Sequence, residues 1–199
     1  MCGENYTDKF MITLIPLYKS KNKNKAEYVY NHTFCRDETV NILYIKYLML
    51  LNRADFLVAE EDDIFRGIVY LLRNKEFVYL FYLVVDKEHR QEGYGSKILH
   101  EVNKIYGDRP IVITIESPYE EEAENIDERK KRLKFYEKNG YSLINESVND
   151  FGINYELIST SENVTKDKFL LFMRKNYFLL YFLIVYYKNE GIFKYLIRQ

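Results

Sequence analysis

The chain has 199 residues, a mass of 24.1 kDa and a formal net charge of −1. Its hydrophobic fraction of 47% is sufficient for the core of one folded domain and excludes a largely disordered chain. The balanced charge argues against a protein that coats nucleic acid, and the two cysteines, Cys2 and Cys35, imply no disulfide framework. The first residues lack the charged-then-apolar pattern of a signal peptide. We therefore expect a cytoplasmic protein without a nucleic-acid partner.

The first half of the chain changes from helical to extended patterns. In chain order we predict a strand over residues 10–18, helices over 26–36 and 40–52, and antiparallel strands over 54–60, 64–72 and 77–85. The last of these segments is an unbroken run of aromatic and aliphatic residues, which is typical of a strand buried on both faces. Glu60 and Glu61 adjoin the turn residues Asp62 and Asp63, so we expect both glutamates to be exposed to solvent.

A glycine-containing loop, Arg90-Gln91-Glu92-Gly93-Tyr94-Gly95-Ser96, joins the buried strand to an amphipathic helix. The apolar residues of that helix recur at helical spacing and are Tyr94, Ile98, Leu99, Val102, Ile105 and Tyr106. Two glycines at such a joint allow a sharp turn and expose backbone N–H groups. Together with the positive end of the helix dipole, these groups form a site suited to phosphate or pyrophosphate. The loop therefore predicts a nucleotide-like ligand.

The spacing of the glycines indicates which nucleotide-like ligand is bound. A dinucleotide-binding loop needs a third glycine where this chain has Ile98, and the phosphate loop with Lys and Ser or Thr is absent. The pattern present is Arg-x-x-Gly-x-Gly, formed by Arg90, Gly93 and Gly95. It resembles the acyl-CoA pyrophosphate loop of the GNAT superfamily of N-acetyltransferases.

A second segment, residues 132–141, resembles the late helix of the same family, which usually ends in Phe-Tyr-Glu-Lys-x-Gly-Phe. Gly140 is well placed to cap that helix, and its predicted apolar face consists of Ala123, Ile126, Leu133 and Tyr136. A strand over residues 111–115 precedes it and ends at Glu116. The order of these elements implies the GNAT fold: an α/β protein with a mixed central sheet flanked by helices.

The end of the chain extends beyond a minimal domain of this family. We predict a hairpin with strands over residues 142–147 and 153–158, and a single GNAT-like domain over 1–199 with an apolar extension over 160–199. Residues 177–187 are all apolar or aromatic, but a helix of that length spans about 16 Å, too short for a hydrocarbon core of about 30 Å. We expect no membrane partner. The extension should pack as a helix on the domain, or as a strand in the interface of a homodimer.

The resemblance implies transfer of an acetyl group from acetyl-CoA to a primary amine, by direct attack in a ternary complex. The implied cofactor site consists of backbone groups of one strand and of the loop, with help from one guanidinium, and its residues are Leu83, Val85, Arg90, Gln91, Glu92, Gly93, Tyr94, Gly95 and Ser96. The strand residues would pair with the pantetheine arm and the loop N–H groups with the pyrophosphate. No metal site is predicted, since the three histidines stand apart.

Two residues are candidates for proton transfer. Tyr136 matches the family motif and would protonate the departing thiolate, although it also fits an apolar core position. Glu116, at the end of its strand, would act as the base directly or through water, or would only cap the next turn. Glu60 and Glu61 are reserve candidates for the base, although their place beside a turn favours exposure to solvent. Arg129 stands where many relatives have an asparagine that contacts pantetheine. It would meet a phosphate of the cofactor or an acidic group of the substrate, or belong to a solvated basic face.

Two other functions are compatible with the same sequence. One is an oxidoreductase that binds an NAD-type dinucleotide, with Glu116 near the position of a ribose-binding acid. The other is a non-catalytic module that binds acyl-CoA. The acceptor is not encoded in a recognisable motif; a polyamine, an aminoglycoside-like amine, an amino acid and a protein amino terminus are all candidates.

Overall fold

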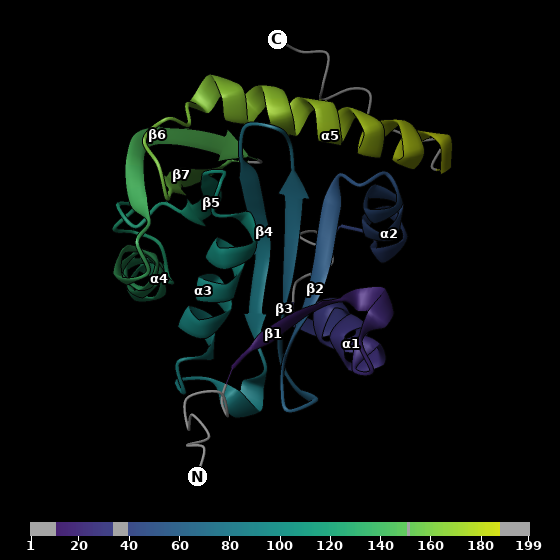
Figure 1. Cartoon of the computed structure of the whole chain (residues 1–199). Coiled ribbons are helices and arrows are strands. Elements are labelled where there is room, and N and C mark those ends of the chain that lie inside the picture. The colour runs from purple at the N-terminus through teal and green to yellow at the C-terminus, as the bar shows by residue number, and fades with distance from the viewer. Residues whose placement is uncertain (1–10, 34–39, 151, 188–199) are drawn as a thin grey trace. The chain divides into compact units, whose positions relative to one another are not determined.

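A computed structural model gives the fold for residues 11–33, 40–150 and 152–187. The chain forms two compact units, Met1–Val164 and Thr165–Gln199. The described residues do not include Cys2 or Cys35. They also leave out the start of the strand predicted at 10–18 and the end of the helix predicted at 26–36. The first unit contains the sheet and the elements that flank it, and the second contains one long helix (Figure 1).

The first unit is built on a seven-stranded mixed sheet in the order β1-β2-β3-β4-β5-β7-β6. The strands are β1 (Thr13–Pro16), β2 (Ala54–Glu61), β3 (Ile64–Arg73), β4 (Val78–Val85), β5 (Ile111–Glu116), β6 (Ser142–Asp150) and β7 (Ile153–Ser159). Within this sheet β4 and β5 are parallel, whereas the other neighbouring pairs are antiparallel. The sheet confirms the predicted fold class.

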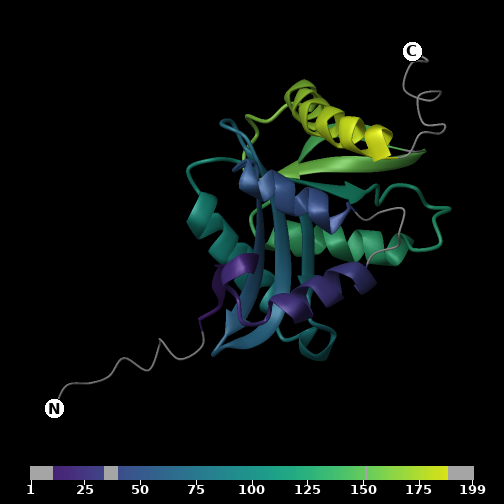
Figure 2. The ribbon, with the colours of Figure 1, turned by 90° about the vertical axis from the view of Figure 1, so that its right-hand side faces the viewer.

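Helices cover both faces of this sheet. They are α1 (Lys23–Thr33), α2 (Ile42–Leu50), α3 (Tyr94–Tyr106) and α4 (Ile126–Lys138), with short 3-10 turns η1 (Leu17–Lys19) and η2 (Lys87–His89). Figures 1 and 2 show α3 and α1 on opposite faces of the sheet. Because β4 is followed by α3 and then by the parallel strand β5, this segment is a single crossover unit.

Alternating strand residues supply two separate cores. Beneath α3, the core includes Val69, Leu80, Ile113, Leu99 and Val102, all at most 2% exposed. On the other face the aromatic core is formed by Tyr30, Phe56, Tyr70 and Tyr82, whose rings contact one another at centroid distances of 5.5–6.3 Å. The continuous apolar sequence of β4 is explained by this burial on both faces.

Several local predictions need correction. Glu60 and Glu61 are buried, at 3% and 4% exposure, because β2 continues to Glu61 and only Asp62 and Asp63 form the turn, each with positive φ. Residue Ala123 precedes α4 in a turn and is not part of its apolar face. Gly140, with φ +85°, ends α4 as predicted.

The second unit contains α5 (Lys166–Tyr187), a helix of 22 residues. Residues 177–187 are therefore helical, and of the two predicted conformations the strand is wrong. None of the described helices is both long and apolar enough to span a membrane. The packing of this extension on the domain or on a partner subunit stays a prediction.

Gly67 on β3 offers a test of the close approach between β3 and β4. A Cβ atom at this position would lie 2.2 Å from the carbonyl oxygen of Val84, so Gly67→Ala must push the two backbones apart. We expect a loss of about 3 kcal/mol in the free energy of unfolding, measured by urea denaturation. Gly152→Ala is the matched control, since its Cβ would meet nothing within 4 Å and only the positive φ costs about 1 kcal/mol. Equal losses for the two variants would contradict this account of Gly67.

Candidate functional site

The parallel strands β4 and β5 are paired over a very short length. Their register contains only Val78 with Ile111 and Tyr79 with Val112 among the described residues. Beyond this point β4 continues to Val85 along β3, and β5 continues to Glu116 along β7. The facing edges of the two strands therefore lose their common ladder, and backbone groups there are available to an extended ligand.

A β-bulge in β4 determines which backbone groups face this unpaired edge. Phe81 is the extra residue, because Tyr70 pairs with Tyr82 whereas Leu71 pairs with Leu80. After the bulge, the Asp86 N–H donates to the carbonyl of Arg66 on β3 at 2.8 Å. Strand alternation then turns the backbone groups of Leu83 and Val85 away from β3 and toward the edge that β5 leaves unpaired.

The glycine loop follows β4 directly and turns into α3. Gln91 and Gly93 both adopt left-handed backbone conformations, with φ of 67° and 82°. The Lys97 N–H donates to the carbonyl of Gly93 at 3.1 Å, which closes the first turn of the helix. No described side chain caps α3, so the N–H groups of Tyr94, Gly95 and Ser96 have no acceptor within the helix. This geometry is that of an anion site.

Gly95 permits close contact between the start of α3 and the end of α4. A Cβ atom on Gly95 would lie 3.0 Å from Cζ of Phe135 and 3.7 Å from a methyl carbon of Val85. The two predicted motifs, which are separated by about 40 residues, therefore meet at one point. The glycine loop, the end of β4 and the ring of Phe135 border the same unpaired edge.

Tyr136, the residue after Phe135, lies in the core beneath α3 and is 8% exposed. Its ring packs edge-on against the ring of Tyr141, with centroids 5.7 Å apart. Burial raises the pKa of the Tyr136 hydroxyl to about 12, so the group keeps its proton at any ordinary pH. Tyr136 is on the same face of the sheet as Leu83 and Val85, which pack against this core.

Glu116 lies at the end of β5 on the face opposite to Ile115, which belongs to the core beneath α3. Its Oε2 atom is 2.8 Å from Nε of Arg129 and accepts a hydrogen bond of 3.0 Å from Asn125. Its Oε1 atom is 3.6 Å from a guanidinium nitrogen of Arg132. One carboxylate oxygen is therefore held firmly, and the other has a longer ion pair.

Arg129 is buried, at 8% exposure, so the prediction of a solvated basic face is wrong for it. Its guanidinium also donates to the carboxylate of Glu120 at 2.7 Å and to the carbonyl of Ser117 at 3.2 Å. The hydrogen bond from Arg129 is the first cause of a lowered pKa for the Glu120 carboxyl. These contacts tie the segment between β5 and α4 to the first turn of α4.

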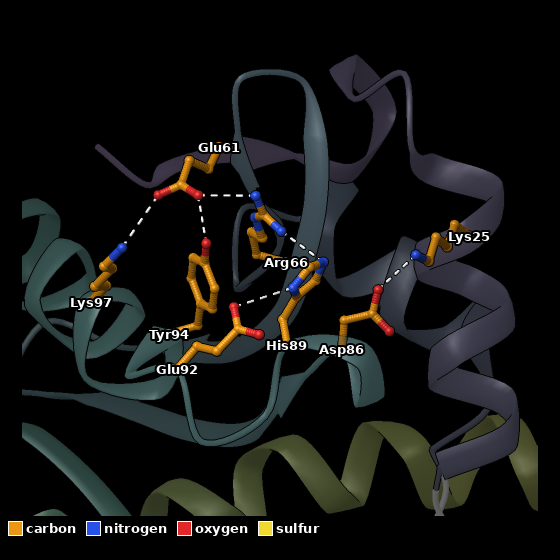
Figure 3. Close-up of polar contacts among 8 residues, drawn as sticks. All are labelled: Lys25, Glu61, Arg66, Asp86, His89, Glu92, Tyr94 and Lys97. Carbon is orange, nitrogen blue, oxygen red and sulfur yellow. Dashed lines mark hydrogen bonds and ion pairs between the residues drawn. The ribbon is translucent and has the colours of Figure 1, made fainter. Parts of the chain in front are cut away.

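A polar cluster that the sequence did not predict lies behind the loop (Figure 3). We call it the Glu61 cluster, and it consists of Glu61, Arg66, His89, Glu92, Tyr94 and Lys97. The carboxylate of Glu61 accepts hydrogen bonds from the hydroxyl of Tyr94 at 2.5 Å, from Arg66 at 3.0 Å and from Lys97 at 3.3 Å.

The donors around Glu61 determine its charge. Burial is the largest single influence and raises the pKa of the carboxyl, but the hydrogen bonds and charges of Tyr94, Lys97 and Arg66 together lower it. The hydrogen bond that the Tyr94 hydroxyl donates to Glu61 is the main cause of a raised pKa for Tyr94. Glu61 is therefore an ionised carboxylate held inside the protein by three donors.

Asp86, Glu88 and His89 have one ligand atom each within 4.8 Å of the others, a spacing that would suit a metal ion. Other contacts engage two of these groups. Asp86 forms an ion pair of 2.6 Å with Lys25, and Nε2 of His89 lies 2.6 Å from a guanidinium nitrogen of Arg66. We therefore do not assign a metal site to Asp86, Glu88 and His89.

The members of the predicted cofactor set lie along β4, in the loop that follows it and in the first turn of α3. Leu83 and Val85 are half-buried, and the loop residues before Tyr94 are exposed; these are Arg90, Gln91, Glu92 and Gly93. The two predicted proton-transfer residues, Tyr136 and Glu116, are reached from opposite faces of the sheet. Nothing in the local sequence pointed to the buried state of Glu61 or of Arg129, because most of their partners are distant in sequence.

Comparisons with known proteins agree with this geometry. Residues 52–143 match the family model described as the acetyltransferase (GNAT) domain. No curated protein sequence matches the chain. A structure described as a GNAT-family acetyltransferase from Bacteroides thetaiotaomicron superposes with a TM-score of 0.66 and 21% identity, covering 82% of this chain and 93% of that one.

Two further solved structures have the same fold with a CoA compound bound. Arabidopsis thaliana Naa50, in complex with the bisubstrate analogue CoA-Ac-MVNAL, superposes with a TM-score of 0.53 and 18% identity, covering 75% of this chain and 98% of that one. An aminoglycoside 6'-N-acetyltransferase complexed with coenzyme A gives a TM-score of 0.58 and 14% identity, with coverages of 78% and 98%. Residues 52–143 therefore match a GNAT acetyltransferase domain, and the chain has the fold that its two motifs predicted.

Proposed function

We propose that the protein transfers an acetyl group from acetyl-CoA to a primary amine by direct attack in a ternary complex. The observation that carries this proposal is the short pairing of β4 with β5, next to the uncapped start of α3. An extended pantetheine chain that ends in a pyrophosphate matches an unpaired strand edge that ends in an anion site. The function is proposed for the cytoplasm, where acetyl-CoA would be the cosubstrate.

In this proposal the cofactor lies along β4. Backbone groups of Leu83 and Val85 pair with the amides of pantetheine, as a neighbouring strand would. The N–H groups at the start of α3, from Tyr94 to Ser96, bind the pyrophosphate. Arg90 is exposed beside them and supplies a positive charge. The thioester then lies between β4 and β5, where both faces of the sheet are within reach.

Tyr136 is the proposed acid. Its raised pKa means that the hydroxyl is always protonated and can donate a hydrogen bond to the departing sulfur. The burial that raises the pKa of Tyr136 would also raise the pKa of a thiol in the same surroundings. Proton transfer depends on the difference between the pKa of the Tyr136 hydroxyl and that of the thiol. This difference is therefore smaller than the Tyr136 pKa of about 12 suggests by itself.

Glu116 is the proposed base for the acceptor amine. It lies on the other face of the sheet, so the amine would approach from the side opposite to Tyr136. Oε1, the oxygen with the longer ion pair, is the atom that would accept the proton, directly or through water. Attack by the neutral amine forms a C–N bond to the acetyl carbon, and the C–S bond breaks as the sulfur leaves. The sulfur takes the proton of Tyr136, and the nitrogen loses one proton to water, from which Tyr136 regains its own.

The acceptor is a small-molecule or peptide amine in this proposal. The two CoA-bound relatives support both classes, one by its peptide-bearing analogue and the other by its aminoglycoside activity.

Homodimerisation through the apolar extension remains part of the proposal. Deleting residues 177–199 should then change the mass of the oligomer, measured by light scattering, from that of a dimer to that of a monomer. A variant that remains dimeric would contradict this part of the proposal.

Thermal unfolding with added ligands tests the cofactor. Acetyl-CoA or CoA at a hundred times its dissociation constant should stabilise the protein by about 2.7 kcal/mol, which raises Tm by about 5–11 °C. NADH should give no rise. A rise with NADH alone would favour the oxidoreductase, whereas a rise with acetyl-CoA but no transfer across an amine panel would favour a non-catalytic acyl-CoA-binding module.

Tyr136→Phe tests the acid. The variant keeps the ring in the core but removes the hydroxyl, so kcat should fall about 100-fold while KM for acetyl-CoA stays unchanged. Tyr141→Phe is the matched control, because Tyr141 is a buried neighbour whose hydroxyl bonds to Asn103 at 3.5 Å. Unchanged turnover of Tyr136→Phe would assign Tyr136 to the core alone.

Glu116→Gln tests the base through the pH dependence of turnover. The neutral amide removes the proton acceptor, so kcat/KM should fall about 100-fold at neutral pH. This loss should shrink as the pH approaches the pKa of the acceptor amine, because the amine then loses its proton without help. Glu120→Gln is the control, since Glu120 is the other acid paired with Arg129. A loss that is the same at every pH would mean that Glu116 only positions the start of α4.

A further inference from the structure

We infer that Glu61 is a positioning residue for the anion-binding loop: its buried carboxylate holds both ends of the loop in the conformation that binds the cofactor pyrophosphate. This inference rests on the proposed function. It assigns a binding role to the β2–β3 hairpin. This hairpin precedes the glycine motif in sequence, and none of the residues of the motif belong to it.

The two ends of the loop are tied to Glu61 by different routes. At the helical end, Tyr94 donates its hydroxyl hydrogen directly to the carboxylate at 2.5 Å. At the strand end, Arg66 connects the carboxylate to Nε2 of His89, at 3.0 Å and 2.6 Å. Nδ1 of His89 then lies 3.3 Å from Glu92 inside the loop. Figure 3 shows this chain of contacts running around the loop.

The loop needs such ties because its own conformation is unfavourable. Gln91 has a Cβ atom and a φ of 67°, a combination that costs about 1–2 kcal/mol. Residues 90–93 are exposed, so burial of their side chains does not fix them. A strained conformation persists where its surroundings determine it, and here the surroundings are the hydrogen bonds of the Glu61 cluster.

Charge provides a way to separate positioning from simple electrostatics. The guanidinium of Arg66 and the ammonium of Lys97 lie 4.8 Å and 4.6 Å from the centre of the Tyr94 ring, directly behind the anion site. Glu61 compensates part of this positive charge. If charge alone mattered, removing the carboxylate would strengthen the binding of an anion. If positioning matters, the same change weakens it, so the two roles have opposite signs.

The chain offers a matched control next to Glu61. Glu60 is equally buried, but its carboxylate accepts hydrogen bonds from Ser20 at 2.5 Å and from Asn22 at 3.1 Å, away from the loop. Glu60→Gln therefore removes the same charge from the same hairpin and disturbs a comparable set of hydrogen bonds. It leaves the contacts of Arg66 and Tyr94 in place.

The experiment measures the Kd of free CoA by titration calorimetry, and kcat with saturating acetyl-CoA, at a temperature well below each Tm. Glu61→Gln should raise Kd about tenfold and leave kcat unchanged, because it loosens the loop and not the reacting groups. Glu60→Gln should leave both values unchanged. Tyr94→Phe, which keeps the ring and the backbone N–H, should also raise Kd, and adding it to Glu61→Gln should raise Kd no further.

Each other outcome overturns the inference. A lower Kd for Glu61→Gln would mean that the carboxylate acts only through its charge. An equal rise for Glu60→Gln would indicate a general weakening of the hairpin. An unchanged Kd for a folded Glu61→Gln protein would remove the positioning role, whereas failure of the wild-type protein to bind CoA would reject the proposed function itself.

Discussion

The two-residue pairing between β4 and β5 is the constraint on which the site depends. Parallel neighbours in a sheet normally share a ladder along their whole length, and here the ladder stops at Tyr79 and Val112. Because β3 supports β4 on one side and β7 supports β5 on the other, each strand continues without the other. The sheet can therefore leave a strand edge unpaired in its middle and remain intact.

The elements around this edge explain why the motifs have their residues. Gly93 supplies the left-handed turn that ends the loop, and Gly95 supplies the space that Phe135 occupies. Phe135 and Tyr136 come from the helix of the second motif, which closes over the same core as α3. Two short motifs at a distance in the chain thus describe one place in the structure, and this is why their joint occurrence predicted the fold correctly.

The sequence was informative where structure depends on local chemistry. Gly93 and Gly140 were predicted as turn and cap residues because a positive φ is a property of one position. The strands were predicted because β-branched and aromatic runs have a local signature. The states of Glu61 and Arg129 were not predictable, since each is buried by partners far along the chain. Tyr94 is 33 residues from Glu61, and Glu116 is 13 residues from Arg129, so the charge of each residue alone suggested exposure.

The bulge at Phe81 has a consequence for how this strand can change. Before the bulge, Val78 directs its N–H toward the β5 side, to the carbonyl of Pro110, and after it the alternation is reversed. If the same residues formed a regular strand without the bulge, the end of β4 would be rotated by half a turn. The half-buried aliphatic side chains of Leu83 and Val85 would then face the aromatic core, and their backbone groups would face β3. Straightening this one bulge, with every motif intact, would convert a strand edge that is open to a ligand into one that is closed.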